Sequence, residues 1–456
     1  MSRLGIVAFS LTLSAAWPAD FRSGAAAVKI TPPPGAPMAG YYYNRAAEGV
    51  HDELWAKAIV IESGGARAAL VACDLSQVSR AVVEKAKEQI QKETGLPSER
   101  VMISGTHTHT GPVLAGSQSR YNFQGEMREI AERYVAGLPA RIAESVRLAS
   151  AALRPARIAA GAGREESLAF NRRFFMKDGS VGWNPGKRNP NIVRPAGPID
   201  PEVGVVYIES ANAEPLATYV NYALHLDTVG GQMFSADYPY TLAATLGKVK
   251  GAGMLTMFTI GCAGNVNHID VSSAVPQKGH EEAARIGTVL AAEVLKTYTR
   301  LSLVEGAIKA RSEILGLPLP EARPDELPWA RGIAAKFGEP KAAPFLDQVK
   351  AFKVIDVIAR EGKPLEAEVQ VIAIGKQLAW VGLPGEIFVE LGQAIKKASP
   401  FPRTIVVELA NGNIGYVPNE KAYHEGNYEV VSARCAAGSG EMLAAAALSR
   451  LKEFFQ

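Results

Sequence analysis

The sequence is poor in cysteine and in aromatic residues, and no long run of charge of one sign interrupts it. Its three cysteines, Cys73, Cys262 and Cys435, allow one disulfide at most, which excludes a small disulfide-stabilised scaffold. Each cysteine lies in or beside an apolar run, so we expect buried free thiols. With 456 residues, 47% of them hydrophobic and 21% charged, the chain is of the globular class and can bury one large core or two ordinary ones.

The charge balance argues against several classes of partner. The formal net charge is +3, and lysine, arginine, aspartate and glutamate are interspersed along the chain. No basic stripe with interleaved aromatic residues is present. We therefore expect no nucleic-acid partner and no acidic polymer as ligand.

The N-terminus differs from the rest of the chain. Arg3 precedes a short apolar run over residues 4–13, and the small residues up to Ala19 resemble a signal-peptidase site. This pattern predicts a secretory signal peptide over residues 1–19 and a secreted or periplasmic mature protein over residues 20–456. The alternative is a buried N-terminal strand or helix. The run is shorter than the roughly 20 apolar residues that span a membrane, and no later segment reaches that length.

Short β-type runs alternate with stretches of helical periodicity. This alternation predicts an α/β fold, with layered mixed β-sheets flanked by helices in one large catalytic domain. We expect strands at residues 54–62, 68–73, 203–208, 217–224 and 253–260, and helices at 79–93, 127–148, 240–248, 281–299 and 441–455. The second helix is expected to kink or break at Pro139. A long polar loop is predicted between a strand that ends at Gly161 and one that begins at Val203, and it includes the Gly/Pro/Asn-rich residues 182–201. A helix is predicted to open at Glu386 and to run through Ala398.

The segment SGTHTHTGP, residues 104–112, follows an apolar run and contains two of the seven histidines. In an extended segment, residues i and i+2 project to the same side, so His107 and His109 can converge on one point. Neutral imidazole is the commonest nitrogen ligand of catalytic zinc. Taken alone, the pattern also fits an ordinary polar loop after a strand.

Three more polar residues lie at or beyond the ends of apolar runs. They are His225, Glu386 and Tyr416. Each also has a purely structural interpretation. His225 could be a hydrogen-bonded core histidine, Glu386 a carboxylate at a helix N-terminus, and Tyr416 a half-buried aromatic residue. Their joint occurrence favours one shared site, because the ends of strands meet at sheet edges where sites form.

Together with ITPPPG at residues 30–35 and VACDL at residues 71–75, these clusters make the chain resemble the catalytic domain of the neutral/alkaline ceramidases, a family of zinc amidases. The resemblance covers nearly all of residues 20–456 in order. It implies a secreted zinc-dependent hydrolase of linear amides, with an N-acyl lipid or N-acyl amine as substrate and peripheral contact with a membrane.

The resemblance also implies residue roles. It implies a Zn²⁺ ion on four ligands: His107, His225, Glu386 and Tyr416. It implies that three further residues line the substrate side and orient or polarise the amide: His109, Arg172 and Tyr428.

One departure concerns the catalytic hydroxyl. Ceramidases of the family carry a serine where this chain has Asn267, and asparagine cannot replace serine as a nucleophile. We therefore expect a zinc-activated water as the attacking group, with Asn267 donating its amide to the oxyanion. His268, Asp227 and His109 are alternative candidates for the base. An esterase or lactonase on the same fold, and a non-catalytic metal-binding descendant that binds a ligand or a surface partner, remain the other readings of the sequence.

Overall fold

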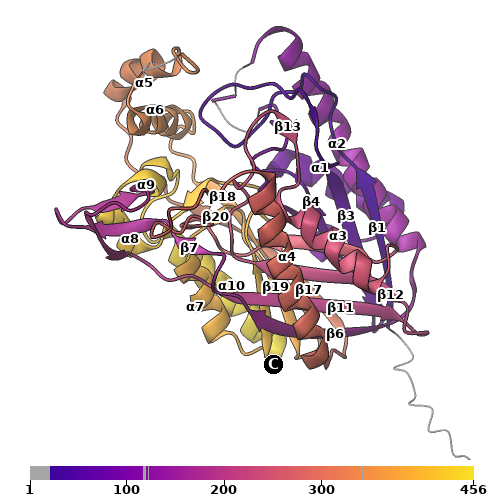
Figure 1. Cartoon of the computed structure of the whole chain (residues 1–456). Coiled ribbons are helices and arrows are strands. Elements are labelled where there is room, and N and C mark those ends of the chain that lie inside the picture. The colour runs from indigo at the N-terminus through magenta and orange to yellow at the C-terminus, as the bar shows by residue number, and fades with distance from the viewer. Residues whose placement is uncertain (1–20, 117–119, 122, 340–342) are drawn as a thin grey trace, which may run out of the picture.

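A large mixed β-sheet runs through the centre of the computed structural model, which describes residues 21–116, 120–121, 123–339 and 343–456 (Figure 1). In this part of the chain the sheet has nine strands in the order β14-β12-β11-β6-β1-β3-β4-β5, with β16 paired to β6. Pairs β4/β5 and β12/β14 are parallel and the others are antiparallel. The strands are β1 (Arg22–Lys29), β3 (Trp55–Ser63), β4 (Ala66–Cys73), β5 (Val101–Gly105), β6 (Arg154–Arg164), β11 (Glu202–Ser210), β12 (Pro215–Tyr222), β14 (Leu255–Ile260) and β16 (Ser302–Leu303).

A second sheet packs face to face against the first. Its order is β17-β18-β19-β21, formed by Ile308–Leu317, Leu365–Ile374, Leu378–Gly382 and Arg403–Val407. One buried cluster joins the two sheets, because Ile59 and Leu70 of the large sheet pack with Ile372 and Trp380 of the small one. Strand residues alternate between faces, so the other face of each sheet is left to pack against helices.

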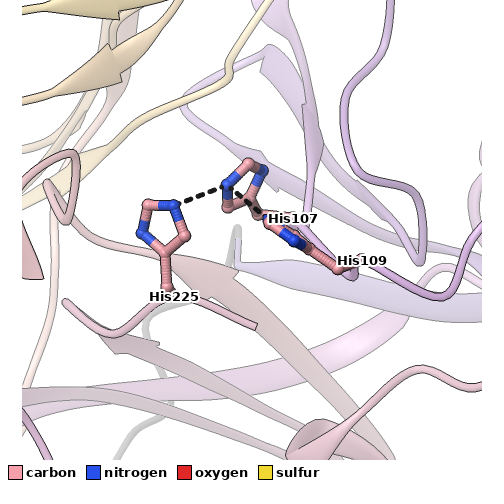
Figure 2. Close-up of side chains that lie close together, drawn as sticks. All are labelled: His107, His109 and His225. Atoms are coloured by element: carbon pink, nitrogen blue, oxygen red, sulfur yellow. Dashed lines mark hydrogen bonds between the residues drawn. The ribbon is translucent and has the colours of Figure 1, made fainter. Parts of the chain in front are cut away.

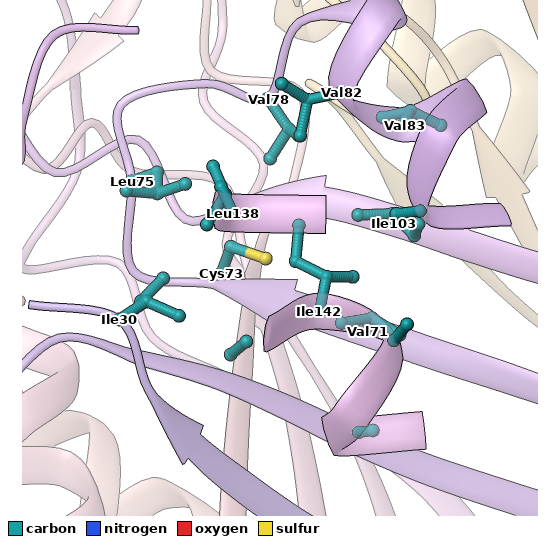
Figure 3. Close-up of a cluster of buried hydrophobic side chains, with 14 of the residues drawn as sticks. Ile30, Val71, Cys73, Leu75, Val78, Val82, Val83, Ile103, Leu138 and Ile142 are labelled. Atoms are coloured by element: carbon teal, nitrogen blue, oxygen red, sulfur yellow. The ribbon is translucent and has the colours of Figure 1, made fainter. Parts of the chain in front are cut away.

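Helices cover both outer faces, which gives a helix–sheet–sheet–helix arrangement. On the large sheet lie α1 (Arg80–Thr94), α2 (Gly125–Ala151), α3 (Tyr238–Lys250) and α4 (His280–Thr297). Figure 3 shows part of this core, where Val83 and Ile142 of the helices meet Val71 and Ile103 of the strands. On the small sheet lie α7 (Val389–Ala398) and α10 (Ser439–Phe455). The predicted α/β fold of layered mixed sheets in one large domain is confirmed.

Smaller elements surround this framework. Helices α5 (Leu327–Ala334) and α6 (Phe345–Ile358) project from it at the top left of Figure 1, and α8 (Glu420–Glu425) and α9 (Tyr428–Ser432) lie beneath them. The short paired strands are β2 (Gly49–Val50) with β13 (Met233–Phe234), β7 (Phe170–Asn171) with β15 (Val266–Asn267), and β20 (Glu386–Ile387) with β22 (Tyr416–Val417).

Two local predictions are wrong, and the predicted break of the second helix is not seen. Helix α2 continues through Pro139, because Leu138 and Ile142 on either side are buried against the sheet and hold the helix in place. The predicted loop between residues 161 and 203 is not only loop, because β9 (Val181–Trp183) and β10 (Ile192–Pro195) pair there with β8 (Arg173–Met176). Glu386 does not open a helix: it lies in β20, and α7 begins at Val389.

The cysteine prediction is confirmed, since Cys73, Cys262 and Cys435 are all buried and free. No helix in the described part of the chain combines the length and apolarity that crossing a membrane requires. The predicted signal peptide over residues 1–19 lies outside the described residues.

Candidate metal centre

Two loops at the end of the large sheet carry the histidines. His107 and His109 follow β5, and His225 follows β12. The backbone ties the loops side by side, because the His109 N–H donates to the Leu226 carbonyl at 2.9 Å. The three imidazoles therefore turn toward one another (Figure 2), and their ligand nitrogens lie within 4.8 Å of one another. These three residues form a cluster that could hold a metal ion.

Hydrogen bonds fix which ring nitrogen of His107 and of His225 carries the proton. Nδ1 of His107 lies 2.9 Å from the Ser76 carbonyl, and Nδ1 of His225 lies 2.9 Å from the Ala263 carbonyl. A carbonyl only accepts, so Nδ1 donates in both rings and Nε2 of the neutral ring carries a lone pair. The two Nε2 atoms face each other at 3.0 Å. Two lone pairs at this distance repel, and a cation or an extra proton between them removes the repulsion.

Burial disfavours a second proton, and thus a positive charge, on the His225 ring. It lowers the pKa of His225 to about 4. Burial also opposes the charge on His107, but the Glu386 carboxylate outweighs it and raises the pKa of that ring. A proton and a metal ion therefore compete for the same position.

Glu386 completes the convergence. Its β20 pairs in parallel with β22, and Glu386 stands opposite Tyr416. Oε2 of Glu386 lies 3.4 Å from Nε2 of both His107 and His225. This oxygen is buried and has no hydrogen-bond partner among the described residues. Burial opposes its charge, yet His107 and His225 hold the pKa of Glu386 well below its usual range.

The separations suit a zinc ion. Two ligands about 2.0–2.1 Å from a tetrahedral zinc lie about 3.3 Å apart. The separations among the His107, His225 and Glu386 donor atoms are 3.0 and 3.4 Å. The three donors thus stand at the spacing of a tetrahedral ligand set.

Arg172 and Tyr428 lie against this centre. Nη2 of Arg172 donates to the Tyr416 hydroxyl at 3.1 Å and to the Gly264 carbonyl at 2.7 Å. Nη1 of Arg172 lies 3.4 Å from Nε2 of His225. The Tyr428 ring packs edge-on against the Tyr416 ring, with centroids 5.3 Å apart. The structure thus brings Arg172, Tyr416 and Tyr428 together with the histidines.

The three other candidate catalytic residues, Asn267, His268 and Asp227, do not line the cavity beside this centre. That cavity, of about 60 Å³, is lined by His107, His109, Glu386, Tyr416 and Tyr428, and its lining includes none of the three. Nδ1 of His268 lies 3.2 Å from Oδ1 of Asp227. The Asn267 amide donates to Asn184 and accepts from the Ile269 N–H, both at 3.0 Å. Asn267 therefore has both side-chain polar atoms engaged away from the cavity.

Two buried glutamates support the site, and sequence reasoning missed both. Glu408 accepts hydrogen bonds from Ala263 N–H at 3.1 Å and from Ile387 N–H at 2.7 Å, so it ties the Ala263 loop to β20. Burial raises its pKa well above the usual range. Glu429 accepts from Arg172 Nε at 2.9 Å. The sequence signal for Glu408 was its place inside the apolar run IVVELA, residues 405–410. Glu429 had no such signal in the sequence.

Part of the chain matches a known protein family. Residues 21–225 match the family described as neutral/alkaline non-lysosomal ceramidase, N-terminal. The neutral ceramidase of Pseudomonas aeruginosa is 31% identical over 170 residues, which are 36% of this chain and 24% of that protein. The matched region thus spans about a quarter of the relative's length.

The fold likeness extends further than the sequence likeness. The crystal structure of neutral ceramidase from Pseudomonas aeruginosa superposes with a TM-score of 0.72 at 21% identity, covering 95% of this chain and 75% of that one. A ceramidase complexed with C2 gives the same TM-score at 20% identity and the same coverage. The first half of the chain thus matches the neutral/alkaline ceramidase family in sequence, and 95% of the chain shares the fold of the solved ceramidase structures.

Proposed function

We propose that this protein is a zinc-dependent hydrolase that cleaves the linear amide of an N-acyl lipid or N-acyl amine. The observation that carries the proposal is the convergence of three acceptor atoms, Nε2 of His107, Nε2 of His225 and Oε2 of Glu386, on one buried point. The relatives named as ceramidases support the choice of an amide as the bond that is cleaved.

Zinc suits the donors that converge here. Imidazole and carboxylate are common zinc ligands, and the Tyr416 phenol opposite Glu386 is the proposed fourth. His109 is the alternative fourth ligand, because its Nε2 lies 3.4 Å from that of His107. A zinc ion bound here supplies a polarised carbonyl and a water whose pKa is lowered to about 7.

The chain's own residues have separate tasks in this proposal. Arg172 holds the Tyr416 phenol in place and puts a positive charge beside the site, where negative charge develops on the amide oxygen. His109 lines the cavity, and its Nδ1 has no hydrogen-bond partner among the described residues, which leaves it available to move a proton to the leaving amine. The Asp227–His268 pair remains the second candidate for proton transfer.

We also propose peripheral contact with a lipid surface. Large hydrophobic side chains are exposed on and near the projecting α5 and α6: Trp329, Phe345 and Leu346 are 40%, 37% and 37% exposed. The Phe345 ring packs against the Tyr428 ring, with centroids 5.4 Å apart, so this apolar surface leads to the candidate site. Export remains a proposal that rests on the signal-like residues 1–19.

The test is metal analysis combined with hydrolysis of a panel of N-acyl amides and matched esters. We expect about one zinc per chain, loss of hydrolysis with a chelator, and recovery when zinc is returned. His225→Ala should lower kcat/KM for amides at least ~100-fold, because it removes a direct ligand. His424→Ala is the matched control, since His424 is exposed and lies outside the site.

Other results would overturn the proposal or part of it. Zinc-independent hydrolysis would remove the metal from the mechanism, and bound zinc without turnover of any substrate would indicate a binding protein. Turnover of esters alone would indicate the esterase. Equal rates for wild type and Asn267→Ala would exclude Asn267 from catalysis.

A further inference from the structure

The side chain of Arg120 lines the same cavity as His107 and His109. Nη2 of Arg120 donates to the Tyr121 hydroxyl at 3.1 Å. The guanidinium carbon of Arg120 lies 4.4 Å from the centroid of the Tyr42 ring and 4.8 Å from that of Tyr121. Its Nε is buried and has no hydrogen-bond partner within the described part of the chain.

Arg120 differs from Arg172 and Arg434 in its lack of a carboxylate partner among the described residues. Arg172 pairs with Glu429 at 2.9 Å, and Arg434, which also lines the cavity, pairs with Asp356. Over the residues that the structure describes, no carboxylate lies within 4.0 Å of the Arg120 guanidinium. A partly desolvated charge without a counter-ion costs free energy, which a ligand of opposite charge returns.

The contacts with aromatic rings account for only part of this arrangement. A cation–π contact stabilises by about 0.5–2 kcal/mol and uses the face of the guanidinium. The five N–H groups of an arginine point outward from its edge and require acceptors. Tyr121 is the one side-chain acceptor for Arg120 among the described residues. The Nε–H at the edge of the guanidinium therefore has no acceptor among the described residues beside the cavity.

We propose that Arg120 binds a carboxylate on the amine half of the substrate, so that the preferred amide is an N-acyl amino acid rather than a neutral N-acyl lipid. This inference rests on the proposed function. The guanidinium fork matches a carboxylate with two parallel hydrogen bonds. The cavity of about 60 Å³ has room for about four water-sized groups. A carboxylate that reaches Arg120 is therefore only a few bonds from the scissile amide. A charged group at the far end of a long acyl chain is too distant to be the one that binds Arg120.

The test compares two amides with the same acyl chain, N-dodecanoylglycine and N-dodecanoylethanolamine, on the zinc-loaded protein. We expect wild type to prefer the glycine amide by at least ~10-fold in kcat/KM, since a hydrogen-bonded charge pair typically contributes this much. Arg120→Gln should reduce that preference at least ~10-fold, and Arg120→Lys should retain part of it. Arg128→Gln is the matched control and should leave the preference unchanged, because Arg128 lies on the exposed face of α2 and pairs with Glu132.

A carboxylate could also bind the zinc ion directly, so binding is measured on metal-free protein by calorimetry. N-dodecanoylglycine should bind wild type ~10-fold more tightly than Arg120→Gln. If dodecanoate loses as much affinity as N-dodecanoylglycine, Arg120 recognises the acid product and the inference is overturned. An equal glycine preference in wild type and Arg120→Gln, with both variants folded, also overturns it.

The two levels of the proposal fail in different ways. Hydrolysis of both amides without charge preference overturns the role of Arg120 and leaves the amidase standing. Hydrolysis of neither amide by the zinc-loaded protein overturns the proposed function itself.

Discussion

At the scale of single residues, the position of Arg172 depends on a buried carboxylate. Glu429 is 0% exposed and accepts from Arg172 Nε and from Arg173 Nη1, both at 2.9 Å. Removing one partner of a buried ion pair leaves an uncompensated charge, which typically costs about 3–5 kcal/mol. Glu429 therefore stabilises the fold and aims the Arg172 guanidinium at the candidate metal centre.

Glu429→Gln should lower both stability and activity. We expect the free energy of unfolding, measured in urea, to fall by roughly 2–5 kcal/mol. We also expect kcat/KM for amides to fall, because Arg172 loses the charge that orients it. Glu425→Gln is the control: Glu425 pairs with Arg173 at 3.2 Å at the edge of the same network, and its change should cost less. Equal stability of wild type and Glu429→Gln would contradict this account.

At the scale of elements, the pair β20/β22 depends on the close approach of a glycine. The Gly264 N–H donates to the Ile387 carbonyl at 2.9 Å. A Cβ at Gly264 would overlap the carbonyl of Glu386. Only a residue without a side chain allows the two backbones to lie so close, so Gly264 sets the position of Glu386, a proposed ligand.

Gly264→Ala should therefore displace β20 and weaken zinc binding by ~10–100-fold, the range seen when the groups supporting a ligand are changed. Competition with a chromophoric chelator measures this affinity. Gly137→Ala is the matched control, because a Cβ there meets no atom within 4 Å. It should leave zinc affinity unchanged and stabilise α2 by about 0.5–1 kcal/mol. Unchanged zinc affinity in Gly264→Ala would show that the position of β20 does not affect metal binding.

At the scale of the whole molecule, the proposed ligands come from four separate segments. His107 follows β5, His225 follows β12, and Glu386 and Tyr416 lie in β20 and β22. An ion held by these four side chains would connect two loops of the large sheet with β20 and β22, which lie next to strands of the small sheet in the sequence. Binding to the folded state alone then stabilises the entire fold.

Removal of the metal should lower the Tm of wild type. At a zinc concentration about 1,000 times Kd the ion contributes ~4 kcal/mol, which for a protein of this size corresponds to a loss of roughly 5 °C. Differential scanning calorimetry with and without chelator measures the shift. His225→Ala should show the same Tm in both conditions, and a chelator-dependent shift in that variant would place the ion elsewhere.

Local pattern was a good guide wherever one element carried its own signal. The α1 helix and strands β3 and β4 lie where periodicity and turns predicted them, because each buries one face or alternates across a sheet. The predicted break at Pro139 does not occur, since the buried Leu138 and Ile142 hold the helix against the sheet. Glu386 misled because a Pro-Gly followed by a carboxylate is typical of a helix start, whereas its partner strand lies at Tyr416, far along the chain.

The sequence by itself determined the α/β class, the buried thiols and the order of the polar clusters, because these follow from residue type and short-range spacing. Only the tertiary structure decided that His107, His225 and Glu386 face one point and that Glu408 and Glu429 support it. It also decided that the Arg120 Nε–H lies near that point with no acceptor in the described part of the chain. Distances between segments more than a hundred residues apart depend on how two sheets pack, and no local pattern encodes that packing.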